Sequence, residues 1–190
     1  MASIEIDMFI QDDFCPDEKI LDKLSDIRVW ESLQGKSCWW EGWWAQEPRN
    51  IWEYIIQMIW SSRGAESNIA GFEYWCNILD ADNQAVNHLG WHIDKDEKLK
   101  QETGENVCPI AGTIFYGYPH NISGGFLEIA TEPTFTDSER ISAKYNRVII
   151  MDVSKQHRVS RIYRGIRVGL QINLWKIKPT LFADSDTAAH

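Results

Sequence analysis

The fold is decided by the stretch Arg167-Val168-Gly169-Leu170-Gln171-Ile172-Asn173-Leu174-Trp175, along which apolar and polar residues alternate. Side chains two residues apart in a β-strand point to the same face. One face of this strand is therefore apolar, and the other carries Arg167, Gly169, Gln171 and Asn173. The polar face either meets water or lines the interior of a β-barrel. The pattern predicts a long strand near 166–177. It does not decide whether Arg167 faces water or the interior of a barrel.

The rest of the chain predicts a β-rich domain with helices near its start. Apolar residues at helical spacing predict helices near 16–28 and 50–61, and a first strand is expected near 3–10. After Gly64 the segments are short and strand-like. We expect a mainly β fold with N-terminal helices packed on one sheet, a double-stranded β-helix or jelly roll. A single domain over 1–178 and a flexible tail over 179–190 are predicted.

Two histidines and an aspartate have the spacing of a metal site. His92 and Asp94 are two residues apart in Trp91-His92-Ile93-Asp94, so a strand can direct both to one ion. His157 follows the apolar run 148–151, which predicts a buried strand. Two imidazoles and one carboxylate can occupy one face of Fe(II) and leave the opposite positions open. We predict these three residues as the catalytic metal ligands.

These residues resemble the Fe(II)- and 2-oxoglutarate-dependent oxygenases, most closely the prolyl-4-hydroxylase-like branch. That family has a His-x-Asp pair, a distal histidine, and a basic residue about ten positions later; here His157 and Arg167 are ten apart. Gly124-Gly125-Phe126-Leu127-Glu128-Ile129 looks like the Gly-Gly turn that enters a core strand in the family. The expected N-terminal strand, followed by a helix after Cys15-Pro16, also looks like the opening of this branch. The resemblance covers residues 4–177.

The resemblance implies a dioxygenase that uses Fe(II), with 2-oxoglutarate and O2 as cosubstrates. Such an enzyme hydroxylates an unactivated C–H of an amino acid, a peptidyl (prolyl-type) residue or a small metabolite, and releases succinate and CO2. Arg167 would hold the distal carboxylate of 2-oxoglutarate through two parallel hydrogen bonds. Asp94 favours hydroxylation over halogenation, because related halogenases have a small residue there. Family members often carry Ser where this chain has Gly169.

A tyrosine usually assists in binding that carboxylate, and this chain offers two candidates. Tyr74 lies in the predicted strand 72–78 upstream of the metal pair, and Tyr116 lies in the strand-like segment 114–116. Either residue is equally well explained as a core aromatic whose hydroxyl is paired. We favour Tyr74 and keep Tyr116 as the alternative.

Composition limits the possible partners and location. The net charge of −9 and the pI near 5.0 argue against broad binding to nucleic acid, which needs clustered basic residues. Five basic residues between Lys155 and Arg167 nevertheless predict a local positive field. No apolar run is long enough to span a membrane and no leader-like segment is seen. The four cysteines are irregularly spaced, so we expect a cytoplasmic protein with reduced thiols and no membrane contact. The oligomeric state is left open.

Two other functions are compatible with parts of the sequence. His88 and His92 are four apart, as in a helical zinc site, but Gly90 argues against a helix there. A non-catalytic, cupin-like binding module with a structural metal is the stronger alternative, because jelly rolls host many functions. The tryptophans are mostly expected to fill the core, and part of the cluster Trp39–Trp44 is a candidate lining for a substrate cleft, since two adjacent pairs cannot all point inward from one strand.

Overall fold

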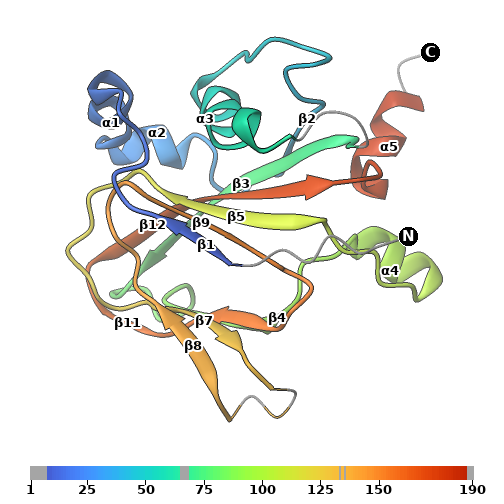
Figure 1. The fold of residues 1–190 in the computed structure, drawn as a ribbon. Helices are drawn as coiled ribbons and strands as arrows, with labels where there is room; N and C mark the ends of the chain where they lie inside the picture. The colour runs from blue at the N-terminus through green and yellow to red at the C-terminus, as the bar shows by residue number, and fades with distance from the viewer. Residues whose placement is uncertain (1–7, 65–68, 133, 135, 188–190) are drawn as a thin grey trace.

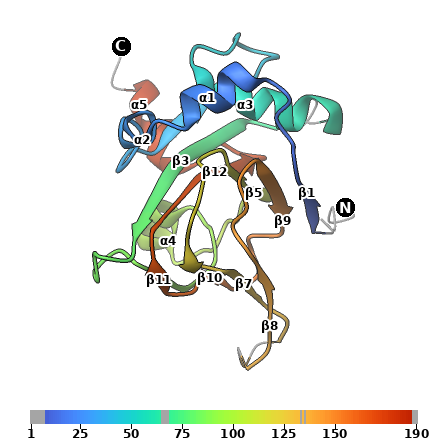
Figure 2. The same cartoon turned by 90° about the vertical axis from the view of Figure 1, so that its left-hand side faces the viewer.

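Two antiparallel sheets face each other, and helices cover the outer face of the larger one (Figure 1). The computed structural model describes residues 8–64, 69–132, 134 and 136–187. Figure 2 shows the smaller sheet on the side away from the helices, so the interior of the barrel lies between the two sheets. This is the jelly-roll architecture that the strand pattern predicted.

The larger sheet has six strands within the described residues, and every neighbouring pair is antiparallel. Their spatial order is β1 (Phe9–Gln11), β9 (Arg147–Met151), β5 (Ala111–Tyr116), β12 (Ile166–Trp175), β3 (Gly71–Asp80) and β2 (Cys38–Trp40). The alternating stretch forms β12, which pairs with β3 along its whole length and with β5 on its other side. It is therefore a central strand with both edges hydrogen-bonded to neighbours.

The smaller sheet carries two of the predicted metal ligands. Its spatial order is β4 (Leu89–His92), β10 (His157–Val159), β7 (Leu127–Ala130) and β8 (Ser138–Ile141). A separate pair joins β11 (Ile162–Arg164) to β6 (Ser123–Gly124). Gly124 and Gly125 both have positive φ, at 81° and 68°, in the turn that leads into β7. This conformation explains the Gly-Gly pair, because residues with a Cβ rarely adopt it.

Three helices cover the larger sheet, namely α1 (Glu18–Leu24), α2 (Ile27–Glu31) and α3 (Ile51–Trp60), which is followed by the 3-10 turn η1 (Ser61–Arg63). The helix predicted near 50–61 is confirmed as α3, and Asn50 caps it by accepting from Trp52 N and Glu53 N. The helix predicted over 16–28 is divided into two. Asp26 accepts from Arg28 N at 3.0 Å and so begins a new helix.

The helix side of the larger sheet is the main apolar core. Val168, Leu170, Ile172 and Leu174 of β12 all belong to it and are at most 3% exposed. Phe72 on β3 is fully buried and contacts the rings of Trp40, Trp43, Trp44 and Trp60. The hypothesis that Trp39–Trp44 lines a substrate cleft is therefore wrong for these rings, because they pack on Phe72 at the helix-to-sheet seam.

The Phe72→Ala variant is expected to lose about 3–5 kcal/mol of unfolding free energy, because a large cavity would open among four tryptophan rings. Urea unfolding followed by tryptophan fluorescence measures this loss. Phe126→Ala is the matched control, since Phe126 is 37% exposed and its truncation opens no enclosed cavity. Equal losses in the two variants would contradict this description of the core.

The C-terminal segment differs from the prediction. Residues Thr180–Thr187 form helix α5, next to α4 (Glu97–Thr103), instead of a flexible tail from 179; residues 188–190 lie outside the described part. Asp96 ties the two together, because its Oδ2 accepts from Thr180 N at 2.7 Å and from Thr180 Oγ1 at 2.8 Å. Phe182 stacks on Trp39 at 5.6 Å between ring centroids. No helix of the described residues is long and apolar enough to cross a membrane.

Candidate metal and cosubstrate site

The predicted ligands His92, Asp94 and His157 meet at one end of the barrel interior. His92 and His157 are direct cross-strand partners on β4 and β10. The Nε2 atom of each lies 3.7 Å from Asp94 Oδ1, and the three ligand atoms all lie within 4.8 Å of one another. Among the described residues, this is the single His, Cys, Asp and Glu group with such a convergence. The donor set and its spacing fit Fe(II).

Backbone carbonyls orient both imidazoles toward this point. His92 Nδ1 lies 2.7 Å from the carbonyl oxygen of Gly90, and His157 Nδ1 lies 2.9 Å from that of Lys155. Each Nδ1–H therefore donates to a carbonyl, and the lone pair of each Nε2 is directed to the shared centre. Burial lowers the pKa of His157 although Asp94 opposes this effect, which favours the neutral imidazole that a metal requires.

Asp94 lies just beyond the end of β4, whereas the sequence placed it on the strand. Its backbone N–H donates to the carbonyl of Val153 at 3.0 Å, which fixes the position of the chain after His92. The carboxylate Oδ2 accepts a hydrogen bond from Asn173 Nδ2 at 3.1 Å. Asn173 belongs to the polar face of β12, so that face reaches the candidate metal site. Oδ1 remains directed toward the two imidazoles.

Arg167 is fully buried on the same polar face of β12. Its Nη2 donates to the hydroxyl of Tyr116, and its guanidinium carbon lies 5.0 Å from the centroid of the Tyr116 ring. Within the described residues, neither Nε nor Nη1 of Arg167 has a hydrogen-bond partner. An enclosed guanidinium with two unpaired donors is costly to bury. It is suited to receive a carboxylate.

Tyr74 does not lie beside Arg167, and the preference for it needs correction. Its side chain belongs to the helix-side core, where its hydroxyl donates to Glu53 Oε1 at 3.2 Å and accepts from Asn50 Nδ2 at 3.3 Å. Phe72 and Cys76, two residues to either side on β3, belong to the same core. The strand therefore turns Tyr74 away from the barrel interior, and Tyr116 is the tyrosine in contact with Arg167.

His120 is a neighbour of Arg167 that the sequence reasoning missed. Its Nε2 accepts from Val168 N at 2.9 Å, and its ring lies 5.7 Å from that of Tyr116. Burial, with a smaller effect of the Arg167 charge, lowers the pKa of His120 to about 4. Its position in the connection after β5 carries no recognisable motif. Only the approach of that connection to the start of β12 brings it to Arg167.

His120 should make stability pH-dependent between pH 6.5 and pH 4. In this window the unfolded chain binds a proton at His120 and the folded chain does not, so folding becomes less favourable as pH falls. The shift corresponds to about 3 kcal/mol. We expect the difference in unfolding free energy between the wild type and His120→Asn to shrink by about this amount from pH 7 to pH 4. A pH-independent difference in urea unfolding would contradict the buried, neutral His120.

Two cavities adjoin the metal ligands. The inner one, about 40 Å³, lies in the barrel interior and is lined by residues that include His157, Gln171 and Asn173. The outer one, about 440 Å³, is the mouth of the site and includes Glu73, Trp75 and Lys95. Both are lined by His92, Asp94 and Trp75. The ligands therefore lie between an enclosed interior and an open entrance, where one side of an ion can be reached from outside.

The fold, though not the sequence, is similar to that of known proteins. No protein-family model matches the chain, and no curated protein matches it. The structure is similar to a Pseudomonas putida prolyl-4-hydroxylase, with a TM-score of 0.58, 13% identity, and coverage of 90% of this chain and 88% of that one. It is also similar to a Trichoplax adhaerens prolyl hydroxylase solved with a hypoxia inducible factor peptide fragment, with a TM-score of 0.57, 15% identity, and coverage of 96% and 87%.

A third similar structure is the viral collagen prolyl hydroxylase of Paramecium Bursaria Chlorella virus-1 in its 2-oxoglutarate complex. The TM-score is 0.56 at 14% identity, and the match covers 90% of this chain and 96% of that one. At such identities the likeness concerns the fold. The chain therefore has the double-stranded β-helix fold of the Fe(II)- and 2-oxoglutarate-dependent oxygenases, in the form that prolyl hydroxylases adopt.

Proposed function

We propose that the protein is an Fe(II)- and 2-oxoglutarate-dependent dioxygenase that hydroxylates an unactivated C–H and releases succinate and CO2. The observation that carries the proposal is the convergence of His92, Asp94 and His157 in a barrel that also encloses Arg167 with two unpaired donors. A cluster of metal ligands alone, or a buried arginine alone, is compatible with other functions. Together they supply an ion with open positions and a separate partner for a carboxylate.

The metal ligands would hold Fe(II), which supplies the activation of O2 that protein side chains cannot provide. His92 and His157 contribute neutral imidazoles held in position by the carbonyls of Gly90 and Lys155. Asp94 contributes the negative charge, and Asn173 fixes the orientation of its carboxylate. Such supporting hydrogen bonds set the geometry and basicity of metal ligands.

Arg167 and Tyr116 would bind the distal carboxylate of 2-oxoglutarate. Arg167 Nη1 is unpaired and Nη2 keeps a second hydrogen beyond its bond to the Tyr116 hydroxyl, so this edge of the guanidinium can donate to both carboxylate oxygens. The inner cavity of about 40 Å³ is too small for this molecule. We therefore expect side chains of the interior to move when it binds. Gln171 is the leading candidate, because its Nε2 is folded back onto the carbonyl of Gly169 at 2.6 Å.

The substrate would enter through the outer cavity and present its C–H at the open side of the ion. This entrance, of about 440 Å³, has the size of a site for a small molecule or one residue of a peptide. Its walls include a flat ring, Trp75, and groups of both charges, Glu73 and Lys95. We propose an amino acid, a peptidyl (prolyl-type) residue or a small metabolite as the substrate class.

A succinate-release screen tests the proposal. Protein loaded with Fe(II) would be given 2-oxoglutarate, O2 and sets of amino acids, short proline-containing peptides and small metabolites. We expect succinate formation that one substrate class stimulates and that His157→Ala abolishes. A non-catalytic binding module would instead bind metal and release no succinate with any class. That result in folded, metal-loaded protein would refute the enzymatic function.

A further inference from the structure

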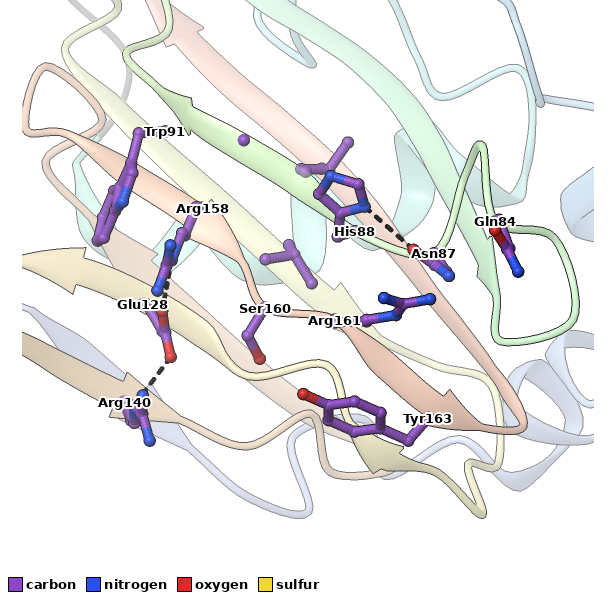
Figure 3. A pocket seen from close by; sticks show the side chains of 13 residues that line it. Gln84, Asn87, His88, Trp91, Glu128, Arg140, Arg158, Ser160, Arg161 and Tyr163 are labelled. Carbon is purple, nitrogen blue, oxygen red and sulfur yellow. Dashed lines mark hydrogen bonds and ion pairs between the residues drawn. The ribbon is translucent and has the colours of Figure 1, made fainter.

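A second groove lies on the outer face of the smaller sheet, and Figure 3 shows the side chains that line it. Neighbouring side chains on a strand point to opposite faces, so Trp91 and Arg158 point outward where His92 and His157 point inward. Glu128 likewise lies between the inward residues Leu127 and Ile129. The groove has a volume of about 530 Å³, and its wall contains none of the three metal ligands.

The groove is positively charged in a chain whose net charge is −9. Its described lining includes three arginines, Arg140, Arg158 and Arg161, and one acidic residue, Glu128. Glu128 is 1% exposed and its oxygens are already used: Oε1 lies 2.8 Å from Arg140 Nε and Oε2 lies 2.5 Å from Arg158 Nε. One carboxylate therefore fixes two guanidinium groups, and their excess charge faces the groove (Figure 3).

Further donors in the groove have no partner within the described residues. The side chain of Arg161 makes no hydrogen bond or ion pair there, and in Figure 3 it lies between Ser160, Tyr163 and Asn87. Asn87 is 2% exposed, its Oδ1 lies 3.0 Å from His88 Nδ1, and its Nδ2 is buried without an acceptor. The Ser160 hydroxyl accepts from Phe126 N and can still donate its own proton. A buried donor without an acceptor is costly, and a ligand with acceptor oxygens can relieve this cost.

Flat rings stand beside these donors. Tyr163 is 73% exposed although its ring borders the groove (Figure 3). At the other end, the guanidinium of Arg158 lies 4.5 Å from the centroid of the Trp91 ring. Exposed aromatic rings next to arginines are the usual platform for nucleobases, which stack on the ring while the cations bind phosphate.

We propose that this groove binds a nucleoside monophosphate, with its phosphate at Arg161 and Ser160 and its base stacked on Tyr163. The volume of about 530 Å³ fits one such molecule. The net charge of −9 disfavours a longer polyanion, because the chain as a whole repels added phosphates. The site is separate from the candidate metal site, so it does not depend on the proposed enzymatic function.

Calorimetric titration of the metal-free full chain with AMP at low ionic strength tests the proposal. We expect saturable binding that weakens as salt rises, with inorganic phosphate and adenosine each binding more weakly than AMP. Arg161→Ala and Tyr163→Ala should each raise the dissociation constant for AMP about tenfold. Tyr163→Phe should retain near wild-type affinity, because it keeps the ring.

Arg164→Ala is the matched control, since Arg164 is exposed, does not line the groove and contacts Asn121. It removes the same charge three residues away and should leave AMP binding within about twofold of wild type. Three results would overturn the proposal: no AMP binding, whether or not an octathymidylate binds; adenosine binding as tightly as AMP; or AMP binding unaffected by Arg161→Ala and Tyr163→Ala. Arg161 and Tyr163 point outward, so thermal unfolding should show both variants folded.

Discussion

Asp94→Ala is expected to weaken Fe(II) binding on the order of 1,000-fold, because one metal ligand typically contributes several kcal/mol. The site would lose the one negatively charged ligand of the three and keep only two imidazoles. Succinate formation should fall at least as far at limiting Fe(II). Anaerobic titration with Fe(II), or with Mn(II) as an oxygen-stable probe, measures the binding directly and does not require a substrate.

The metal-free fold should tolerate this substitution. The side chain of Asp94 accepts one hydrogen bond from Asn173 and otherwise faces two histidines, so its loss removes little that stabilises the protein without metal. Asp82→Ala serves as the matched control, because Asp82 is an exposed acidic residue in the turn after β3. If Asp94→Ala and Asp82→Ala bind Fe(II) equally well, His92, Asp94 and His157 do not form the metal site.

Arg167→Met is expected to weaken 2-oxoglutarate binding about 100-fold, the effect of losing two charge-assisted hydrogen bonds. Methionine fills much of the same space without the charge. Because two donors of Arg167 are buried without partners, the unfolding free energy without 2-oxoglutarate should change by no more than about 1 kcal/mol. Lost cosubstrate affinity with retained stability distinguishes a binding arginine from a structural one.

Arg164→Met is the control for charge, since Arg164 is exposed and contacts Asn121. Tyr116→Phe should give an intermediate loss of affinity, because it removes only the hydroxyl that holds Nη2 of Arg167. Calorimetric titration of the Mn(II)-loaded variants with 2-oxoglutarate measures all three. If Arg167→Met binds 2-oxoglutarate as the wild type does, Arg167 does not hold its carboxylate.

Local patterns predicted the strands and the polar face of the barrel well. The alternation in β12 requires only that one face meets the helices, and its four apolar residues do so. The sequence could not choose between water and an interior for Arg167. That choice depends on the smaller sheet, which faces the polar side of β12 across the interior of the barrel. The spacing of His92 and Asp94 predicted that the two side chains converge, although Asp94 lies beyond the strand and is positioned by its hydrogen bond to Val153.

The incorrect predictions concern residues whose positions depend on contacts between segments far apart in the sequence. Tyr74 and Tyr116 both lie in strands, and only the packing of each sheet face decides which one reaches Arg167. The flexible tail was predicted from composition, whereas α5 is held by Asp96, which lies 84 residues before Thr180. His120 was missed for the same reason, since its partner Val168 is 48 residues away. Local sequence patterns contain no information about contacts between segments that are far apart in the chain.

The most direct test of the central claim is anaerobic visible spectroscopy of the full chain with Fe(II) and 2-oxoglutarate. A keto acid chelated to Fe(II) gives a weak visible charge-transfer band. We predict that this band appears only when Fe(II) and 2-oxoglutarate are both present and that His157→Ala abolishes it. In Arg167→Met the band should require higher concentrations of 2-oxoglutarate. Folded protein that binds Fe(II) yet gives no band at saturating 2-oxoglutarate would contradict the assignment of a 2-oxoglutarate-dependent oxygenase.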